Sequence, residues 1–270
     1  MLDLDEQIEA VHVIGPDNSA KTYGLAKERY KWASVSKLLA MHVFADAIVS
    51  GFISLDDQID HPNIDNSVTL ADLLSHSSGI KPELESPIEP CTKRIYSNIA
   101  FDIAEQHLIK KLGPGFEGQS VGSLFNDGFK HDLNSSIEFS GSCAFTANGT
   151  FDDLILFLNE IRNPKLIDPS IFSLLTSPHN DGLPGILPGW GHQENNTWGI
   201  GYEIKGNKDP HWMGSLASEK SYGHFGMAGT FIFHDPVNNI SVALQSAKDF
   251  GPWAKHIWPP LCKEIYNLFA

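Results

Sequence analysis

The stretch WASVSKLLAMHVFADAIVSG, residues 32–51, constrains the fold more than any other part of this sequence. It predicts a helix that begins near Ser34 and that Gly51 ends, and it is too apolar for a helix lying on a surface. Such a helix belongs in a core, yet it opens with Ser34, Ser36 and Lys37. Because burying an ammonium group without a partner is costly and usually lowers its pKa, Lys37 requires a role beyond packing.

Composition places the chain among globular proteins and argues against two classes of partner. Apolar residues make up 41% and charged residues 19% of the 270 positions, which fits one larger domain or two lobes sharing one core. Acidic residues outnumber basic ones, 33 to 19, and no basic stripe is present, so we expect no nucleic-acid partner. Charges interrupt the longest apolar runs, which predicts no membrane span.

The N-terminus and the cysteines bear on location and on cofactors. The opening MLDLDEQIEA is acidic and lacks a basic region followed by an apolar run, so it is not typical of a signal peptide. Three cysteines, an odd number without a CxxC pair, are typical of reduced thiols. These features predict a cytoplasmic protein. The twelve histidines show neither HExxH nor paired spacing, so we expect no metal and no cofactor.

Periodicity in the rest of the chain predicts strands at both ends and helices between them. Strands are expected in a hairpin over residues 8–25 and again over residues 197–206, 229–236 and 239–247. Further helices are expected at residues 69–79, 98–113 and 150–163, and at residues 251–269, where Pro259 and Pro260 favour a break. Residues 183–196 are rich in Gly and Pro and indicate a long loop.

These elements predict an α+β fold of the α/β sandwich type, because a hairpin at the start can pair with strands near the end. We expect an antiparallel sheet flanked by a terminal helix, with an inserted all-helical lobe. Residues 1–270 form a single domain, in which residues 1–30 and 185–270 are the sheet lobe and residues 31–184 the helical lobe. A binding site at the seam of two such lobes is a common outcome.

Ser34 and Lys37 are three residues apart and therefore share one face of the helix. A lysine held in an apolar wall can lose its proton near neutral pH and serve as the base that a serine nucleophile needs. Unpaired N–H groups at the helix start can bind a developing oxyanion. The motif is short, and we interpret a second match, Ser78 to Lys81 in a polar turn, as coincidence.

Two further motifs follow, Tyr96-Ser-Asn98 before a helix and His224-Phe-Gly226 on an expected edge strand. In this order the three motifs resemble those of the serine β-lactamase and penicillin-binding protein superfamily, in particular its class C and family VIII esterase-like branch. The resemblance covers most of residues 33–247. It implies the β-lactamase/transpeptidase-like fold and a catalytic domain.

The resemblance also implies a role for each matching residue. Ser34 is the acylated nucleophile, Lys37 its proton partner, and Tyr96 the second member of the base system. A nearby cation such as Lys37 would have to lower the pKa of the Tyr96 phenol before it could act as a base. Which of the two residues takes the serine proton stays open at this point.

The remaining matches imply contacts with substrate. Asn98 hydrogen-bonds substrate and Lys37, and Gly226 lets the substrate backbone lie close to the strand. The N–H groups of Ser34 and Met227 form the oxyanion hole. His76 also matches a feature of the family, and we assign it the structural role of holding a turn.

His224 stands where β-lactamases generally carry a lysine. A neutral imidazole offers a hydrogen bond but no fixed cation, although lowering the pH toward 6 would begin to protonate it. We therefore predict a serine hydrolase that forms an acyl-enzyme on Ser34 and acts on a small-molecule ester or amide. The alternatives are a β-lactamase or D-alanyl-D-alanine carboxypeptidase and, from another class, a non-catalytic binding protein on the same fold. The sequence indicates no oligomeric state.

Overall fold

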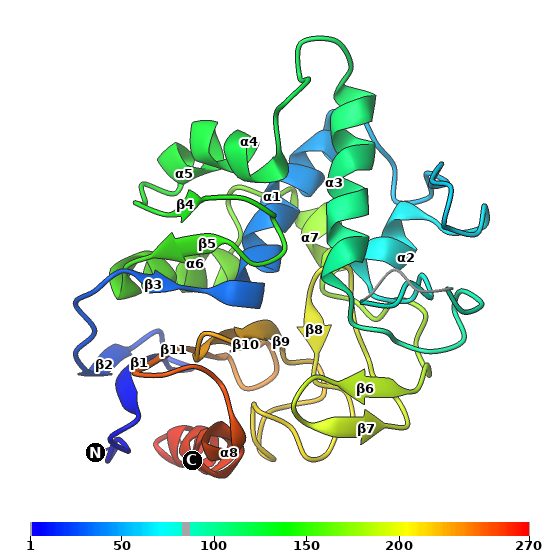
Figure 1. Ribbon diagram of the computed structural model, residues 1–270. Coiled ribbons are helices and arrows are strands. Elements are labelled where there is room, and N and C mark those ends of the chain that lie inside the picture. Colours follow the sequence, from blue (N-terminus) through cyan, green and yellow to red (C-terminus); the bar gives the residue numbers. More distant parts are fainter. Residues whose placement is uncertain (1, 83–86, 270) are drawn as a thin grey trace.

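The computed structural model describes residues 2–82 and 87–269, and the fold class is the predicted one (Figure 1). The helices are η1 (Ala33–Val35), α1 (Ser36–Val49), α2 (Leu70–Leu74), α3 (Asn98–Leu112), α4 (Val121–Asp127), α5 (Phe129–Asp132), α6 (Phe151–Arg162), α7 (Pro169–Leu175) and α8 (Pro252–Asn267). The strands are β1 (Ile8–Ile14), β2 (Ala20–Gly24), β3 (Tyr30–Lys31), β4 (Glu138–Phe139), β5 (Ala147–Gly149), β6 (Gly185–Leu187), β7 (Gly191–Gln193), β8 (Glu203–Ile204), β9 (Tyr222–Gly226), β10 (Thr230–Asp235) and β11 (Ile240–Ser246).

A six-stranded antiparallel sheet in the order β2-β1-β11-β10-β9-β8 is the scaffold of the molecule. The predicted pairing of the two chain ends is confirmed, since β1 lies antiparallel to β11, with Val11 opposite Leu244. The N-terminal hairpin and the C-terminal strands therefore complete one sheet, and the chain between them is an insertion packed above it (Figure 1).

The sheet is buried on both faces, which explains why β10 and β11 in its centre carry apolar side chains on both faces. Successive side chains on a strand point to opposite faces. In β10, Phe231 and Phe233 join the apolar cluster that contains α8, whereas Ile232 joins the cluster that contains α1. Helix α8 covers one face and the inserted helices cover the other (Figure 1).

Helix α8 passes through Pro259 and Pro260 without a break, so the sequence-based expectation of a break there is wrong. Each proline removes one backbone hydrogen bond of the helix. Apolar burial offsets this loss, because Trp258, Cys262 and Ile265 on one face of the helix are completely buried against the sheet.

The inserted region is mainly helical, but it also contains a small sheet, β3-β5-β4, that the sequence analysis did not predict. Thr69 and Thr150 cap α2 and α6 through capping boxes, which confirms those two helix starts. Helix α2 is shorter than expected. It ends at Leu74, and His76 just beyond it has a left-handed backbone with a φ of 61°.

The segment 183–196 is not the long loop that its glycines and prolines indicated. Strands β6 and β7 pair antiparallel in it, with Gly189 in the left-handed conformation between them. The neighbouring segment 197–206 contributes only the two residues of β8. The expected lobe boundaries after residues 30 and 184 stay predictions.

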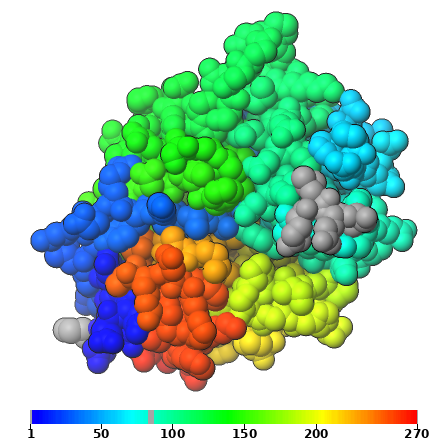
Figure 2. All heavy atoms as spheres, in the orientation of Figure 1, coloured from blue at the N-terminus to red at the C-terminus, as the bar shows by residue number. Residues whose placement is uncertain are grey.

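The two halves of the molecule meet along one seam. Figure 2 shows the helical insertion, in green and cyan, above the C-terminal strands and helix, in orange and red. Among the described residues, no helix is long and apolar enough to cross a membrane.

Candidate active site

Ser34 lies at this seam, where the segment that leads into α1 meets β9. Ala33, the residue before it, has a left-handed φ of 45°, which is uncommon for a residue other than glycine. The carbonyl of Trp32 lies directly against Gly226, where no Cβ would fit. Gly226 therefore lets β9 approach the serine segment of the protein itself, whereas we expected it to make room for substrate backbone.

Ser36 fixes the position of the nucleophile segment. Its hydroxyl donates a hydrogen bond to the carbonyl of Ala33 at 2.5 Å and accepts one from the N–H of Ala147 at 2.9 Å. The N–H of Trp32 donates to the carbonyl of the same Ala147 at 2.9 Å. These bonds tie the start of α1 to β5, so the second serine of the opening motif has a structural role.

Lys37 is completely buried, and its Nζ has three polar neighbours. The nitrogen lies 2.7 Å from Asn98 Oδ1, 2.9 Å from the carbonyl oxygen of Ala144 and 3.3 Å from Ser34 Oγ. Both closer acceptors are neutral oxygens. The structure thus brings together Ser34, Lys37 and Asn98, as the sequence predicted.

Burial lowers the pKa of Lys37 from its usual range to about 7. A neutral amine has two N–H donors and one lone pair. The oxygens of Asn98 and Ala144 accept the two hydrogens, so the lone pair is left to face Ser34 Oγ. Neutral Lys37 is therefore oriented to accept the proton of the serine hydroxyl.

Tyr96 approaches the same oxygen from the start of α3. Its hydroxyl donates to Ser34 Oγ at 2.6 Å, and its ring centroid lies 4.9 Å from Lys37 Nζ. Burial raises the pKa of Tyr96, so the expectation that Lys37 would lower it is wrong. The phenol keeps its proton at neutral pH and is a donor. Of the two groups, Lys37 is the one whose pKa lies near neutrality.

His76 holds the segment that carries Tyr96. Its Nδ1 accepts a hydrogen bond from the N–H of Ser97 at 3.3 Å, and its carbonyl accepts one from the N–H of Ile95 at 3.0 Å. The imidazole and phenol rings are 4.4 Å apart between centroids. The structural role predicted for His76 is confirmed.

His224 faces Tyr96 from β9. Its Nδ1 lies 2.6 Å from the carbonyl oxygen of Phe225, which can only accept, so Nδ1 carries the hydrogen and Nε2 is an acceptor. Nε2 lies 3.4 Å from the Tyr96 hydroxyl. Burial, reinforced by the charge of Lys37, lowers the pKa of His224 to about 3. The imidazole is neutral at every physiological pH, and the expectation that it begins to gain a proton near pH 6 is wrong.

Strand β9 is not the edge strand that the sequence predicted, because β8 lies outside it in the sheet. Within the described residues, β8 pairs only with Tyr222 and Gly223, and the strand beyond them borders a cavity. That cavity is lined by Ser34, Tyr96, Leu187, Pro188, Trp198, Glu203, His224, Phe225 and Met227. Ser34 and Met227 thus share one cavity, and the oxyanion hole formed by their N–H groups stays a prediction.

A buried charge cluster in the wall of this cavity was missed by the sequence analysis. Glu203 accepts hydrogen bonds from His211 Nε2 at 2.7 Å and Trp212 Nε1 at 2.9 Å, and Lys208 Nζ lies 3.3 Å from its carboxylate. Burial opposes ionisation, but Lys208 and His211 hold the pKa of Glu203 down to about 2. The available signal was a glutamate in the otherwise apolar strand segment GIGYEI. No cluster of His, Cys, Asp and Glu in residues 2–82 and 87–269 could hold a metal ion.

Comparisons with known proteins identify the family of the chain. The family model described as Beta-lactamase matches residues 19–127. A β-lactamase from Mycobacterium bovis is 30% identical and superimposes with a TM-score of 0.86 over 96% of this chain and 94% of its own. A more distant structure, EstCE1, described as a hydrolase with promiscuous acyltransferase activity, shares the fold with a TM-score of 0.71 at 14% identity over 97% of this chain and 94% of its own.

A curated relative matches a shorter part of the chain. The N-acetylmuramyl-L-alanine amidase of Bacillus subtilis (strain 168) is 30% identical over 120 residues, which are 42% of this chain but only 24% of the amidase. The likeness to the Mycobacterium bovis protein extends over almost the whole of both chains and includes the region of the family model. The chain therefore belongs to the serine β-lactamase and penicillin-binding protein superfamily.

Proposed function

We propose that the protein is a serine hydrolase that forms an acyl-enzyme on Ser34 and acts on a small ester or amide. The observation that carries this proposal is the placement of the Lys37 amine. Two neutral oxygens take its hydrogens, and its lone pair faces Ser34 Oγ at 3.3 Å. A serine hydroxyl becomes a nucleophile when an adjacent base takes its proton. The predicted cytoplasmic location is part of the same proposal.

Acylation begins when Lys37 takes the proton of Ser34 and Oγ attacks the carbonyl carbon of the substrate. The N–H groups of Ser34 and Met227 stabilise the oxyanion of the tetrahedral intermediate. The bond between the carbonyl carbon and the leaving atom then breaks, and the Tyr96 hydroxyl gives its proton to that atom. Lys37 returns a proton to the Tyr96 phenolate, so both groups recover their starting states as the alcohol or amine leaves.

Deacylation follows the same proton path in reverse. A water molecule takes the place of the leaving group, attacks the acyl carbonyl carbon and gives its proton to the pair of Tyr96 and Lys37. The ester bond to Ser34 Oγ breaks, the serine regains a proton from this pair, and the carboxylic acid is released. The cycle consumes one water molecule per ester or amide bond.

The neutral wall at β9 supports a substrate that places no charge beside His224. His224 has a pKa of about 3 because it is buried and lies near Lys37, so it supplies no cation for an anionic group of the substrate. The charge of Lys208 is matched by that of Glu203 at 3.3 Å. Burying a carboxylate beside this wall without a partner is costly.

Hydrolysis of β-lactams is the second candidate, because the Mycobacterium bovis protein that is 30% identical to this chain is described as a β-lactamase. The same acyl-enzyme chemistry applies to a lactam carbonyl. The two candidates differ in whether the substrate carries a carboxylate at the β9 wall. They are separated by comparing one ester with one β-lactam, as described in the Discussion.

The test of the proposed function is to trap the acyl-enzyme. After mixing with p-nitrophenyl butyrate, we expect a burst of nitrophenol and, after acid quench, one butyryl group on the peptide that contains Ser34. The Ser34→Ala variant gives neither. Turnover with the adduct on another residue would contradict the assignment of Ser34. Absence of both turnover and adduct with esters, amides and β-lactams would favour the non-catalytic binding protein.

A further inference from the structure

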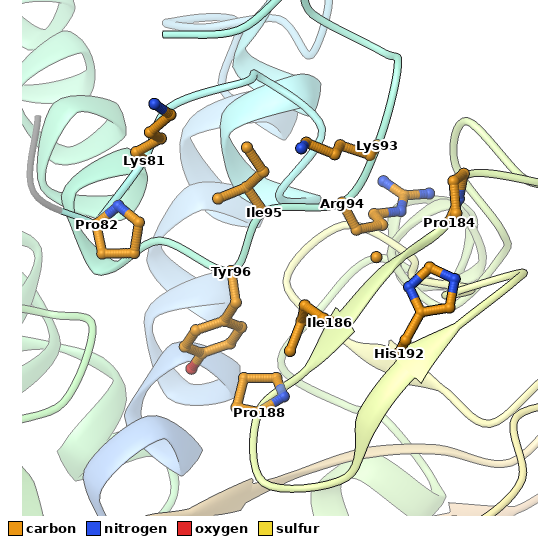
Figure 3. A pocket seen from close by; sticks show the side chains of 11 residues that line it. Lys81, Pro82, Lys93, Arg94, Ile95, Tyr96, Pro184, Ile186, Pro188 and His192 are labelled. Atoms are coloured by element: carbon orange, nitrogen blue, oxygen red, sulfur yellow. The ribbon is translucent and has the colours of Figure 1, made fainter. Parts of the chain in front are cut away.

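A second and larger cavity, of about 690 Å³, opens directly beyond Tyr96. Tyr96 and Pro188 line both this cavity and the narrow one that contains Ser34. Figure 3 shows Tyr96 and Pro188 at one end, Ile95 and Ile186 along the sides, and Lys93 at the other end. The proposed mechanism so far assigns this space no role.

The part of the cavity nearest Tyr96 is apolar. Ile95, Ile186 and Pro188 form it together with the face of the Tyr96 ring (Figure 3). Ile186 is 58% exposed on the β6–β7 ribbon, and its side chain points toward Tyr96. A concave, mostly apolar space of this size beside reactive groups is typical of a ligand subsite.

The far end of the cavity is basic. Lys93, which is exposed, and the buried Arg94 line it, and no acidic side chain among the described residues does. Arg94 is held in place by hydrogen bonds to four backbone carbonyls, those of Ser75, His179, Asn180 and Asn196. The charges of Asp181 and Asp72 act on Arg94 and offset its own, so Lys93, which can move to meet an anion, is the cation available to a ligand. A cluster of this sign stands out in a chain with a net charge of −14.

The proton path identifies which half of a substrate reaches this cavity. Tyr96 gives its proton to the leaving atom, so that atom must lie at the Tyr96 hydroxyl. A group attached to it then extends along the Tyr96 ring and past Pro188. The acyl half stays on the side of Ser34, whereas His224 Nε2, 3.4 Å from the Tyr96 hydroxyl, faces the leaving atom.

We propose that this cavity binds the leaving group of the substrate, and that this group is an apolar chain or ring that ends in an anion. The inference rests on the proposed hydrolase function. It places the anion-binding group of the site at Lys93, at the end of the cavity opposite Tyr96.

The experiment compares three acetate esters that share one acyl group: ethyl acetate, hexyl acetate and 6-acetoxyhexanoate. Each buried methylene is worth about fourfold in binding, and hexyl acetate has four methylenes more than ethyl acetate. Burial of two of them already gives about 16-fold, so we expect hexyl acetate to exceed ethyl acetate in kcat/KM by about tenfold or more. The terminal carboxylate should add a further gain of about two- to fivefold at low salt, as for an exposed ion pair, and this gain should fade at high salt.

Two variants assign these gains to the cavity. Ile186→Ser should reduce the advantage of hexyl acetate, and Lys93→Gln should abolish the gain from the carboxylate, while ethyl acetate is hydrolysed as before in both. The matched controls are Val237→Ser, an apolar residue that is 61% exposed in the β10–β11 turn, and the exposed Lys255→Gln on α8. Both controls should leave all three ratios unchanged.

Three results would overturn the inference while leaving the hydrolase intact. Equal kcat/KM for ethyl and hexyl acetate would show that the cavity takes no leaving group, and a carboxylate gain that persists in Lys93→Gln would refute the anion site. An effect of Ile186→Ser on the acyl-chain dependence of p-nitrophenyl acetate and hexanoate would place the acyl half there instead. If no ester is turned over, binding of 6-acetoxyhexanoate to Ser34→Ala by calorimetry decides. Binding that is weakened by Ile186→Ser and Lys93→Gln supports the subsite, and no binding refutes it.

Discussion

Two lysines of the molecule, Lys37 and Lys208, are buried, and they differ in whether a carboxylate lies beside the amine. Among the described residues, the groups within hydrogen-bonding distance of Lys37 Nζ are neutral oxygens, those of Asn98, Ala144 and Ser34. Lys208 lies 3.3 Å from the carboxylate of Glu203 and 2.6 Å from the carbonyl oxygen of Thr197.

The charge partner decides what each lysine can do. Burial lowers the pKa of Lys37 to about 7, so the amine is unprotonated in about half of the molecules at neutral pH. Burial lowers the pKa of Lys208 as well, but the charge of Glu203 opposes this and the pKa is about 8. Lys208 is therefore protonated in most molecules at neutral pH. A buried lysine with a carboxylate partner is thus a structural cation, and one without such a partner is available as a base.

The largest effect on activity should come from removing the hydroxyl of Ser34, the group that Lys37 is proposed to deprotonate. Ser34→Ala should lower the hydrolysis of p-nitrophenyl esters by about 10³-fold or more, because no nucleophile is left to form the acyl-enzyme. Circular dichroism should show an unchanged fold. Ser78→Ala, in the second Ser-x-x-Lys match, is the control and should be nearly silent. If Ser34→Ala retains most of its activity, the nucleophile is another residue.

Exchanging the two lysines for methionine should separate their roles. Lys37→Met should lower kcat/KM by about 10²- to 10⁴-fold, as expected for loss of a general base, and should leave the protein folded. Lys208→Met should reduce the free energy of unfolding by about 3–5 kcal/mol, because it leaves the Glu203 carboxylate buried and unpaired. Urea unfolding and ester kinetics on both variants measure this contrast. An inactive but fully stable Lys208→Met protein would contradict it.

A double-mutant cycle sharpens the account of Lys37 further. Tyr96→Phe should lower kcat/KM by about 10²-fold or more, because the leaving atom loses its proton donor. The double variant Lys37→Met with Tyr96→Phe should be little worse than the worse single variant, since groups that pass one proton between them act as a unit. Losses that multiply would show that the two residues act independently.

The smallest effect concerns His224 on β9, which stands where β-lactamases generally carry a lysine. We expect a short ester such as p-nitrophenyl butyrate to be a better substrate than nitrocefin, because His224 is neutral. His224→Lys should raise the ratio of nitrocefin to ester kcat/KM by about tenfold, the value of one charge-assisted contact. The parent ratio should not change between pH 7.5 and 6, since the pKa of His224 is about 3. Nitrocefin as the better parent substrate by tenfold would establish the β-lactamase alternative.

Much of the fold could be predicted because its main elements carry strong local signals. The hairpin β1–β2, the capping residue Thr150 and the apolar run of α1 are all evident in the sequence. Strands β3 to β8, which the sequence analysis missed or made too long, have only two or three residues each. Segments this short show no detectable periodicity. They depend on pairing between distant segments, as when Tyr30 lies opposite Gly149.

In the candidate site, too, some features could be predicted from the sequence and others depend on contacts between distant segments. Helix spacing predicted that Ser34 and Lys37 would meet, and the family resemblance implied that Tyr96 and Asn98 would join them; the four residues do meet. The protonation states of Tyr96 and His224 could not be predicted, because they depend on how completely distant segments bury each ring. The contact of Gly226 with the Trp32 carbonyl is likewise a product of tertiary packing.

The central claim is that neutral Lys37 activates Ser34, and the pH dependence of fluorophosphonate labelling tests it most directly. Only the unprotonated amine can take the serine proton, so the labelling rate should fall about tenfold for each pH unit below 7 and level off above it, reflecting the lowered pKa of about 7. Mass spectrometry should locate the adduct on Ser34, and Lys37→Met should label slowly without this pH dependence. Labelling that rises only toward pH 10, that occurs on another residue, or that keeps its pH profile in Lys37→Met would contradict the account.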